Sequence, residues 1–464
     1  VAHPRRRQNQ RLVGHFAQTP VIGGKLHEGS QKDRTPDGLL LQFRRQRLVE
    51  PGQIFHKQGN DMIKRREFFV GSALTAAAAR RVWGANDRIG IGLIGCGNRG
   101  INALMKGAFQ FREESNIEFR AACDIWRQHR DEAVAYAKKE QGSEPKPISA
   151  YRELLAMKEV DAVIIATPDH QHAAMLTDAV RAGKDAYVEK PLAMDMRDLL
   201  TAVDTVKKSD RIVQMGTQIR SLPSSMGAKA FITGGGLGQV FKIEQERNGL
   251  KPYWHRYGER KIEEGDTDWK AFVFNRKARA WDPDQHSAWY GYRDFSRGPH
   301  ANLMVHFIDL VHHITGNHVP KRCVTLGGTY RFKDNRSAPD SVETILEYDD
   351  FLVRYSTAFG TGHGNYLKFF GTKGTLDASN WSGKPFPVLS QGAEQPLPEG
   401  TFPPEVQSDP HMLNWLKCLR SRQQPNAPIE AGYAHSVAVI LSDEALIRGR
   451  RMVHDPARRI VREG

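Results

Sequence analysis

A glycine-rich turn between two apolar segments constrains this chain more than any other feature. Residues 88–94 read Arg-Ile-Gly-Ile-Gly-Leu-Ile, and Gly95, Gly97 and Gly100 follow in the spacing G-x-G-x-x-G. The short, isoleucine-rich run is typical of a buried parallel strand, and residues 101–105 are apolar enough to begin a helix. Strand, glycine turn and helix together predict a dinucleotide-binding unit that holds a pyrophosphate. Because glycine-rich turns are common, the motif needs support from the rest of the chain.

The next 120 or so residues supply that support as an alternation of strands and helices. Apolar runs that predict strands alternate with segments of helical period, and Gly183 is suited to end one of these helices. We predict strands at 117–124, 160–167, 186–190 and 212–216, and helices at 151–155, 171–182 and 196–208. This alternation favours a doubly wound parallel sheet.

Asp124 stands at the carboxyl end of the second predicted strand, 24 residues after Gly100. An acid near this spacing binds the adenosine ribose hydroxyls and repels a 2′-phosphate. The residue therefore favours NAD over NADP, although Arg127 is close enough to soften the preference. A helix cap is the alternative role for Asp124.

The pattern changes after Gly216. Alternating polar and apolar residues predict antiparallel strands with one solvated face, with Asp349 and Asp350 in a hairpin turn. We interpret 254–297 as long ordered loops over a site, and 411–419 and 434–446 as helices. The chain is thus predicted to be α/β, with a Rossmann domain at 86–216 and a mostly antiparallel α+β domain at 217–464. The predicted antiparallel strands are 238–245, 323–330, 341–348, 351–357 and 366–371.

The N-terminal region has a different composition. Residues 1–61 are polar and basic without a sustained period, which predicts disorder, and we interpret them as lying outside the natural protein, with translation starting at Met62. Residues 62–85 contain Arg65-Arg66, Phe68-Phe69 and an alanine run, the layout of a twin-arginine signal. We therefore expect export to a periplasmic or other extracytoplasmic space; a chance Arg-Arg pair in a cytoplasmic protein is the alternative.

Charge, cysteines and hydropathy exclude several other classes. The net charge of +14 comes largely from basic clusters near the two ends, without a basic helix interleaved with aromatics, so we expect no nucleic-acid partner. After the N-terminal region no run is long and apolar enough for stable membrane insertion. The four cysteines lack C-x-x-C spacing, so we interpret them as buried residues and expect no metal site.

Three ordered motifs resemble the glucose–fructose oxidoreductase and inositol dehydrogenase (Gfo/Idh/MocA) family. They are Gly95–Gly100, Ala-Thr-Pro-Asp-His at 166–170, and Glu-Lys-Pro at 189–191. The resemblance implies a C-terminal domain with a large open sheet, a homodimer or homotetramer, and a carbohydrate substrate. It also implies cofactor contacts from Gly95, Gly97, Asn98, Arg99, Gly100, Asp124, Thr167, Pro168, His170, Glu189 and Lys190.

The same resemblance supplies the predicted catalytic residues. Lys190 would lie beside the nicotinamide and the reacting hydroxyl, where a cation stabilises a developing alkoxide. Many members also carry Asp-x-Gly-x-His-x-x-Asp; here residues 302–309 keep His306 and Asp309, but Asn302 replaces the first acid. We predict His306 as the general acid/base and Asp309 as its orienting partner or a ligand of a sugar hydroxyl. His306, Asp309 and His313 share one helix face, but the family needs no metal there.

Further residues are predicted to contact substrate. Gln218, Arg220 and Asn302 are the main candidates, although the amide of Asn302 cannot take a proton. Aromatic and basic residues of the 254–297 loops could stack on sugar rings or equally could be packing residues. They are Arg256, Trp269, Tyr290 and Tyr292.

We therefore predict an NAD(P)-dependent oxidoreductase acting on a hydroxyl of a sugar, cyclitol or glycoside. Export would favour a tightly bound NAD that is recycled within the site, because free NAD is scarce outside the cytoplasm. An NAD-dependent glycosidase of the same family, working by oxidation, elimination and reduction, is one alternative. A nucleotide-binding protein without catalysis is another, because Asn302 departs from the family pattern.

Overall fold

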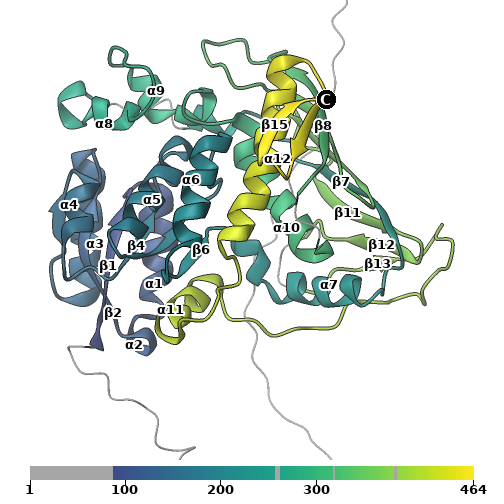
Figure 1. Cartoon of the computed structure of the whole chain (residues 1–464), viewed down its shortest axis with the longest axis horizontal. Helices are drawn as coiled ribbons and strands as arrows, with labels where there is room; N and C mark the ends of the chain where they lie inside the picture. Colours follow the sequence, from purple (N-terminus) through teal and green to yellow (C-terminus); the bar gives the residue numbers. More distant parts are fainter. Residues whose placement is uncertain (1–86, 257–261, 317–318, 381–383) are drawn as a thin grey trace, which may run out of the picture. The chain divides into compact units, whose positions relative to one another are not determined.

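Two β-sheets organise the part of the chain described by the computed structural model, residues 87–256, 262–316, 319–380 and 384–464 (Figure 1). The predicted N-terminal segments 1–61 and 62–85 lie outside the described residues. Within the described residues no helix is long and apolar enough to cross a membrane, and all four cysteines are buried and unpaired.

The first sheet confirms the predicted Rossmann topology. Its six strands are all parallel, in the order β3-β2-β1-β4-β5-β6. The strands are β1 (Ile89–Ile94), β2 (Ile117–Cys123), β3 (Lys146–Ile148), β4 (Ala162–Ile165), β5 (Asp185–Val188) and β6 (Val213–Met215). The sequence analysis missed β3, because it has three residues, two of them exposed, and so lacks the apolar run of a buried strand.

Helices connect these strands and cover the sheet. Between them the chain forms α1 (Lys106–Phe109), α2 (Arg112–Ser115), α3 (Arg127–Gln141), α4 (Tyr151–Ala156), α5 (His172–Arg181) and α6 (Met196–Lys207). A π-helical turn, η2 (Gly100–Met105), leads into α1 directly after the glycine motif. Turns of this type are rare in proteins as a whole, and those that occur are often found at functional sites.

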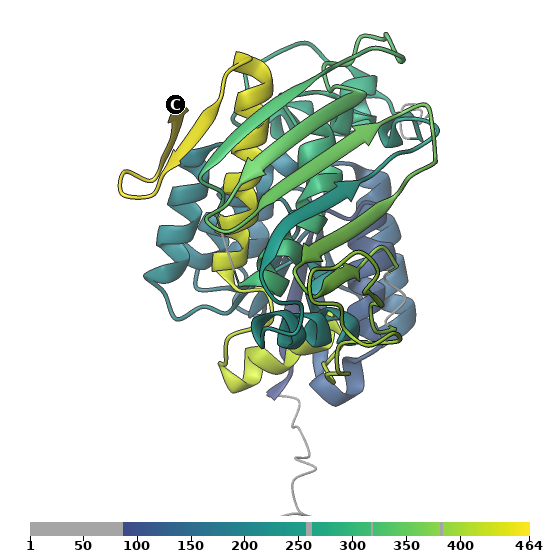
Figure 2. The same ribbon diagram turned by 90° about the vertical axis from the view of Figure 1, so that its right-hand side faces the viewer.

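The second sheet has nine strands, in the order β13-β12-β11-β7-β10-β9-β8-β14-β15. All neighbouring pairs are antiparallel except β7 and β10, which are parallel. Burial alternates along β8 and β9, as the sequence pattern predicts, and one face of the sheet is turned toward the viewer in Figure 2. The strands are β7 (Val240–Glu246), β8 (Arg322–Gly328), β9 (Ser341–Glu347), β10 (Leu352–Ala358), β11 (Tyr366–Gly371), β12 (Gly374–Asp377), β13 (Val388–Leu389), β14 (Met452–Asp455) and β15 (Ile460–Glu463).

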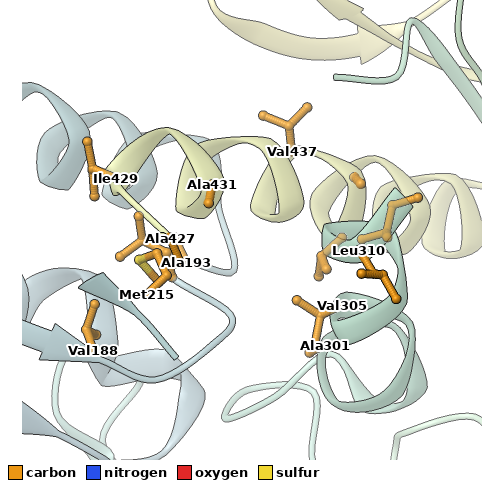
Figure 3. Close-up of a cluster of buried hydrophobic side chains, with 14 of the residues drawn as sticks. Val188, Ala193, Met215, Ala301, Val305, Leu310, Ala427, Ile429, Ala431 and Val437 are labelled. Atoms are coloured by element: carbon orange, nitrogen blue, oxygen red, sulfur yellow. The ribbon is translucent and has the colours of Figure 1, made fainter. Parts of the chain in front are cut away.

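Two helices lie between the sheets and join them into one core. α10 (Val305–Thr315) and α12 (Ile429–Arg448) bury side chains on more than one side, as expected of helices inside a core. Figure 3 shows Ile429 and Ala431 of α12 near Met215 of β6, with Val305 of α10 on the other side of the same cluster. A further helix, α7 (Pro223–Thr233), comes after the last strand of the first sheet in the sequence.

The chain returns to the first sheet after the second one. α11 (His411–Ser421) buries Trp415 and Leu416 in the same cluster as Ile91 and Phe119 of the first sheet. Arg422 pairs with Asp185 of β5 at 2.5 Å. The predicted boundary at 216/217 therefore marks the end of the first sheet in sequence, but not in packing.

Residues 254–297 are not the long loops that the sequence analysis expected. Their described part contains α8 (Trp269–Val273), α9 (Pro283–Ser287) and single helical turns at Glu264–Asp266 and Trp289–Gly291. Asp268 and Asp282 cap α8 and α9 by accepting backbone N–H bonds. Helices of five residues carry too little periodic pattern to be recognised in a sequence.

Candidate active site

The three glycines of the turn differ in how closely neighbouring atoms approach them. Gly95 has φ = +89° and lies so close to Ala166 that a Cβ would be 2.6 Å from its carbonyl carbon, and a Cβ at Gly100 would be 2.0 Å from the Gly95 oxygen. Gly97 is open: only His129 would lie within 4 Å of its Cβ, at 3.7 Å. Gly95 and Gly100 thus shape the turn, and Gly97 leaves its backbone accessible to a ligand.

A cavity of about 880 Å³ opens beside this turn. It is lined by Gly95 and Gly97 after β1, Thr167 after β4 and Lys190 after β5. These positions are the carboxyl ends of adjacent parallel strands, on either side of the point where strand order reverses, and dinucleotides bind there in such sheets. The open glycine turn, the acid after β2 and the size of the cavity fit a dinucleotide.

Asp124 lines the cavity at the end of β2. Its carboxylate accepts backbone N–H bonds from Cys96 at 2.7 Å and Trp126 at 2.8 Å, which hold it against the glycine turn. Arg127 is not among the cavity residues, and its guanidinium pairs with Asp266 at 2.7 Å. The cation that could soften the preference for NAD is therefore engaged elsewhere.

Arg99 links the glycine turn to the end of β5. Its Nε donates to Glu189 at 2.6 Å, and an Nη donates to Gln218 at 3.3 Å. The Glu189 carboxylate raises the pKa of Arg99 above its already high usual value. All three side chains line the cavity, so this cluster fixes one wall of it.

Lys190 lines the cavity in the segment that follows β5. His172 holds this segment in place. Its ring nitrogens lie 2.8 Å from the carbonyl oxygens of Thr167 and Pro191 and so connect the two loops. Burial lowers the pKa of Lys190, and the carboxylates of Asp169 and Glu189 oppose that shift. A lysine with a lowered pKa gives up its proton more readily than an exposed lysine does.

His306 also lines the cavity, in the first turn of α10. Burial, and then the cation of Lys190, lower its pKa well below the usual value, so the ring is neutral at physiological pH. Its Nδ1 is buried without a hydrogen-bond partner among the described residues. A neutral imidazole beside a lysine is suited to accept a proton.

Asp309 and Arg220 occupy a different place from the one expected. Neither lines the cavity; they form a buried ion pair in which Arg220 Nε donates to Asp309 Oδ2 at 2.6 Å. The N–H of Leu192 donates to His435 Nε2, and His435 Nδ1 in turn donates to Asp309 Oδ1 at 3.3 Å. Asp309 therefore orients His435 rather than His306, because one turn of α10 separates a cavity-facing position from an interior one.

Asp169 is a cavity residue that the sequence analysis did not select. Its Oδ2 accepts hydrogen bonds from Ser296 Oγ at 2.7 Å and Asn302 Nδ2 at 3.3 Å. Burial raises its pKa, and the nearby Lys190 cation opposes the shift. Its place in the Ala-Thr-Pro-Asp-His motif was the signal available in the sequence.

Two other expectations about the site need correction. Gly100 and His170 do not line the cavity; His170 donates from Nε2 to the carbonyl of Phe272 at 2.8 Å and so holds the segment that covers the site. Of the loop residues, Tyr290 lines the cavity, with its ring centroid 3.6 Å from that of Trp289, whereas Trp269 and Tyr292 do not. The side chain of Arg256 lies outside the described part of the chain. The predicted residues that do line it are Gly95, Gly97, Asn98, Arg99, Asp124, Thr167, Pro168, Glu189, Lys190, Gln218, Asn302 and His306.

The described residues contain no group of three histidine, cysteine or acidic side chains arranged to hold a metal ion. Asp309 and His313, which share a face of α10 with His306, have other partners than a metal ion. Asp309 is paired with Arg220, and an Nη of Arg220 lies 3.5 Å from His313 Nδ1. His306 lies alone of these residues on the cavity wall.

Two family models match different parts of the chain. Residues 89–217 match a family model described as an oxidoreductase family with an NAD-binding Rossmann fold. Residues 271–377 match the model of the Gfo/Idh/MocA C-terminal domain. Together the two models cover just over half of the sequence.

Curated and solved proteins are similar at lower identity. A glycosyl hydrolase family 109 protein of a Shewanella species is 27% identical over 188 residues, 36% of this chain. The match spans 40% of the length of that relative. An aldose–aldose oxidoreductase from Caulobacter crescentus has a TM-score of 0.60 at 17% identity, over 79% of this chain and 99% of its own. The WlbA dehydrogenase from Bordetella pertussis, solved with NADH and UDP-GlcNAcA, has a TM-score of 0.59 at 18% identity, over 79% and 98%.

Proposed function

This chain belongs to the Gfo/Idh/MocA family, and from that premise we propose that it is an NAD-dependent oxidoreductase acting on a hydroxyl of a carbohydrate. One observation carries the proposal: a single cavity is lined by an open glycine turn and Asp124 and also by Lys190 and His306. The first pair of features suits a dinucleotide, and the second suits the proton transfer that accompanies oxidation of a hydroxyl.

Bound NAD would supply hydride transfer to or from a carbon of the substrate. The chain itself supplies orientation and proton transfer. His306, held neutral by burial and by Lys190, accepts the hydroxyl proton. Lys190 stabilises the developing alkoxide through its charge. The segment tied down by His170 and Gln171 covers the site and limits the access of water.

A carbohydrate substrate agrees with the cavity wall and with the relatives. Stacked Trp289 and Tyr290 provide aromatic surface, and Gln218, Asn302 and Asp169 provide polar groups. The aldose–aldose oxidoreductase and the UDP-GlcNAcA-bound dehydrogenase act on or bind sugars by name. Sugar rings combine apolar faces with hydroxyl groups, so a wall of this mixture suits them.

A redox-neutral reaction is the second candidate, because of the similarity to a glycosyl hydrolase family 109 protein. In that case a glycoside would be oxidised, its leaving group eliminated and replaced by the elements of water, and the resulting ketone reduced, with bound NAD supplying the hydride chemistry in both directions. The NAD would stay bound and be recycled, as in an oxidoreductase that oxidises one sugar and reduces another.

Absorbance of the purified protein in the reduced-nicotinamide band tests these proposals. Glucose, myo-inositol, levoglucosan and p-nitrophenyl α-N-acetylgalactosaminide are added singly, with and without free NAD. A change in the band with a sugar supports the dehydrogenase, and nitrophenol release without net change in the band supports the glycosidase. The matched pair Lys190→Met and Lys229→Met separates loss of catalysis from general damage to the protein, because Lys229 is at an exposed position of α7. Activity unchanged in Lys190→Met, or bound NAD without turnover of any sugar, would contradict the proposal.

We also propose that the second sheet mediates a homodimer or homotetramer. Val324, Leu326 and Leu352 of β8 and β10 are 46%, 78% and 47% exposed, and the pairing register places them on one face. That face is in front in Figure 2. An exposed apolar sheet face marks an interaction surface. Sedimentation of wild type and Leu326→Asp tests this: a monomeric wild type would refute it.

We propose, finally, that residues 62–85 direct export by the twin-arginine route. A fusion of this segment to a reporter that is active only outside the cytoplasm tests it. Replacement of Arg65 and Arg66 by lysine should keep the reporter inside, whereas the same replacement at Arg80 and Arg81 should not. Export that is insensitive to Arg65 and Arg66, or a mature N-terminus upstream of Met62, would contradict the proposal.

A further inference from the structure

Asn302 leaves the site without a carboxylate where many members of the family have one. The Asn302 amide does not point to solvent: its Nδ2 lies 2.6 Å from Ser296 Oγ and 3.3 Å from Asp169 Oδ2. Asn302 is 8% exposed and Asp169 3% exposed. A carboxylate is thus present in the cavity, but it comes from the loop after β4 and not from the turn before α10.

The two oxygens of Asp169 have different environments. Oδ2 accepts from Ser296 and Asn302, whereas no described residue donates to Oδ1. Asp169 lines the cavity together with Lys190, Asn302 and His306. The buried carboxylate therefore keeps one free acceptor inside the site, and that acceptor is the kind of partner that a sugar hydroxyl requires.

Asp169 and Lys190 also interact through charge. The charged and titratable groups around this pair are His172 and Tyr253 near Asp169, Glu189, Arg99 and His435 near Lys190, and His306 on α10. Among them, the Asp169 carboxylate makes the largest contribution that favours the charged form of Lys190. Removal of that carboxylate would leave the lysine with Glu189 alone as an opposing charge, and Glu189 is already engaged by Arg99.

We propose that Asp169 supplies the active-site carboxylate that the Asn302 position lacks, acting as a positioning residue that keeps Lys190 charged and offers Oδ1 to a substrate hydroxyl. The role of Oδ1 rests on the proposed function; the effect on Lys190 does not. Asn302 and Ser296 hold the carboxylate in place, and the amide at position 302 is then a complement to Asp169 rather than a defect.

The charge of Lys190 can be measured without any substrate. Trace labelling with acetic anhydride, read at Lys190 by mass spectrometry, reports the fraction of the amine that is unprotonated. In Asp169→Asn we expect labelling of Lys190 at neutral pH to rise about tenfold or more, because loss of a neighbouring opposite charge favours the neutral amine. Asp443→Asn is the matched control: Asp443 is a buried carboxylate, paired with Arg293 and Arg297, outside the cavity.

Exchange of the two residues makes the test specific. In the double variant Asp169→Asn, Asn302→Asp the hydrogen bond between the two side chains is kept with its direction reversed, and the carboxylate returns to the position before α10. Labelling of Lys190 should fall back toward the wild-type value. Unchanged labelling in folded Asp169→Asn, or no recovery in the double variant, would overturn the proposal.

A sugar that changes the nicotinamide band in the panel above provides the second readout. Asp169→Asn should raise KM for that sugar and shift the alkaline limb of kcat/KM to lower pH, because Lys190 then loses its charge at a lower pH, and the double variant should restore the limb. If no sugar reacts with the wild-type protein, the proposed function fails. The labelling experiment still tests the effect of Asp169 on Lys190, because it needs no substrate. An unshifted limb in Asp169→Asn would overturn the role of the carboxylate.

Discussion

Two successive turns of α10 use their polar side chains in opposite ways. His306 faces the cavity, with a neutral ring and a buried nitrogen that lacks a partner among the described residues. Asp309, one turn later, is 1% exposed and is bonded to Arg220 and His435. The comparison teaches that polar residues within one motif separate into reactive and structural groups according to whether their hydrogen bonds are completed inside the protein.

The largest effect is expected on the cavity side, in His306→Asn. Loss of a general base costs about 10²- to 10⁴-fold in kcat, while the free energy of unfolding should change little, because the ring makes few internal bonds. Steady-state kinetics and urea unfolding are measured on the same preparation. His363→Asn, at an exposed position, is the control, and wild-type activity in His306→Asn would remove His306 from the mechanism.

Asp309→Ala should show the reverse pattern. It leaves Arg220 buried and unpaired, and breaking a buried ion pair in this way costs about 3–5 kcal/mol of stability. Urea unfolding measures the loss. A variant that is fully stable but inactive would mean that Asp309 is catalytic after all and that the comparison is wrong.

Low pH should reduce the contribution of the Asp309 carboxylate to the stability of the protein. Arg220 and His435 hold the pKa of Asp309 below its usual value, so the stabilisation is complete above the unfolded-state pKa of about 3.9. It is lost as the pH falls from there toward the folded-state pKa. The stability gap between wild type and Asp309→Asn should therefore be widest at neutral pH and should narrow below about pH 4. A gap that does not depend on pH would show that the charge of Asp309 contributes nothing.

The smallest effect is expected for the exposed pair Arg127–Asp266. Its side chains are 65% and 39% exposed, and exposed pairs contribute about 0–1 kcal/mol. Asp266→Ala should leave the free energy of unfolding within that range. It also frees Arg127, so NADP binding measured against NAD should improve modestly. A loss of several kcal/mol would show that this contact, unlike other exposed pairs, holds the covering segment in place.

Much of the fold followed from local pattern. The isoleucine-rich strands, the glycine spacing and the helix periods of the first sheet are properties of neighbouring residues, and the same is true of the alternation in β8 and β9. The three-residue β3, the short helices of the covering segment and the return of α11 to the first sheet could not be read in this way. They depend on contacts between residues far apart in the sequence, such as Trp415 with Tyr187.

In the candidate site, too, some residues could be predicted from local sequence and others depend on contacts between distant residues. Lys190, Asp124 and Gly97 are determined by position, because each follows a parallel strand and the carboxyl ends of such strands meet at one edge of the sheet. Arg220 and Asp309 were assigned to substrate and catalysis from the family resemblance, and a resemblance in sequence does not reveal whether two charges 89 residues apart neutralise each other. Asp169 was missed for the same reason, since its partners Ser296 and Asn302 come from the other half of the chain.

By itself, the sequence determined that this protein has a dinucleotide cradle and which side chains stand at the strand ends around it, because those features depend on backbone geometry and residue order. Only the tertiary structure decided which polar groups remain open to the cavity. That decision depends on burial and on hydrogen bonds completed across the two sheets, where an ion pair removes Asp309 from the site and an amide brings Asp169 into it.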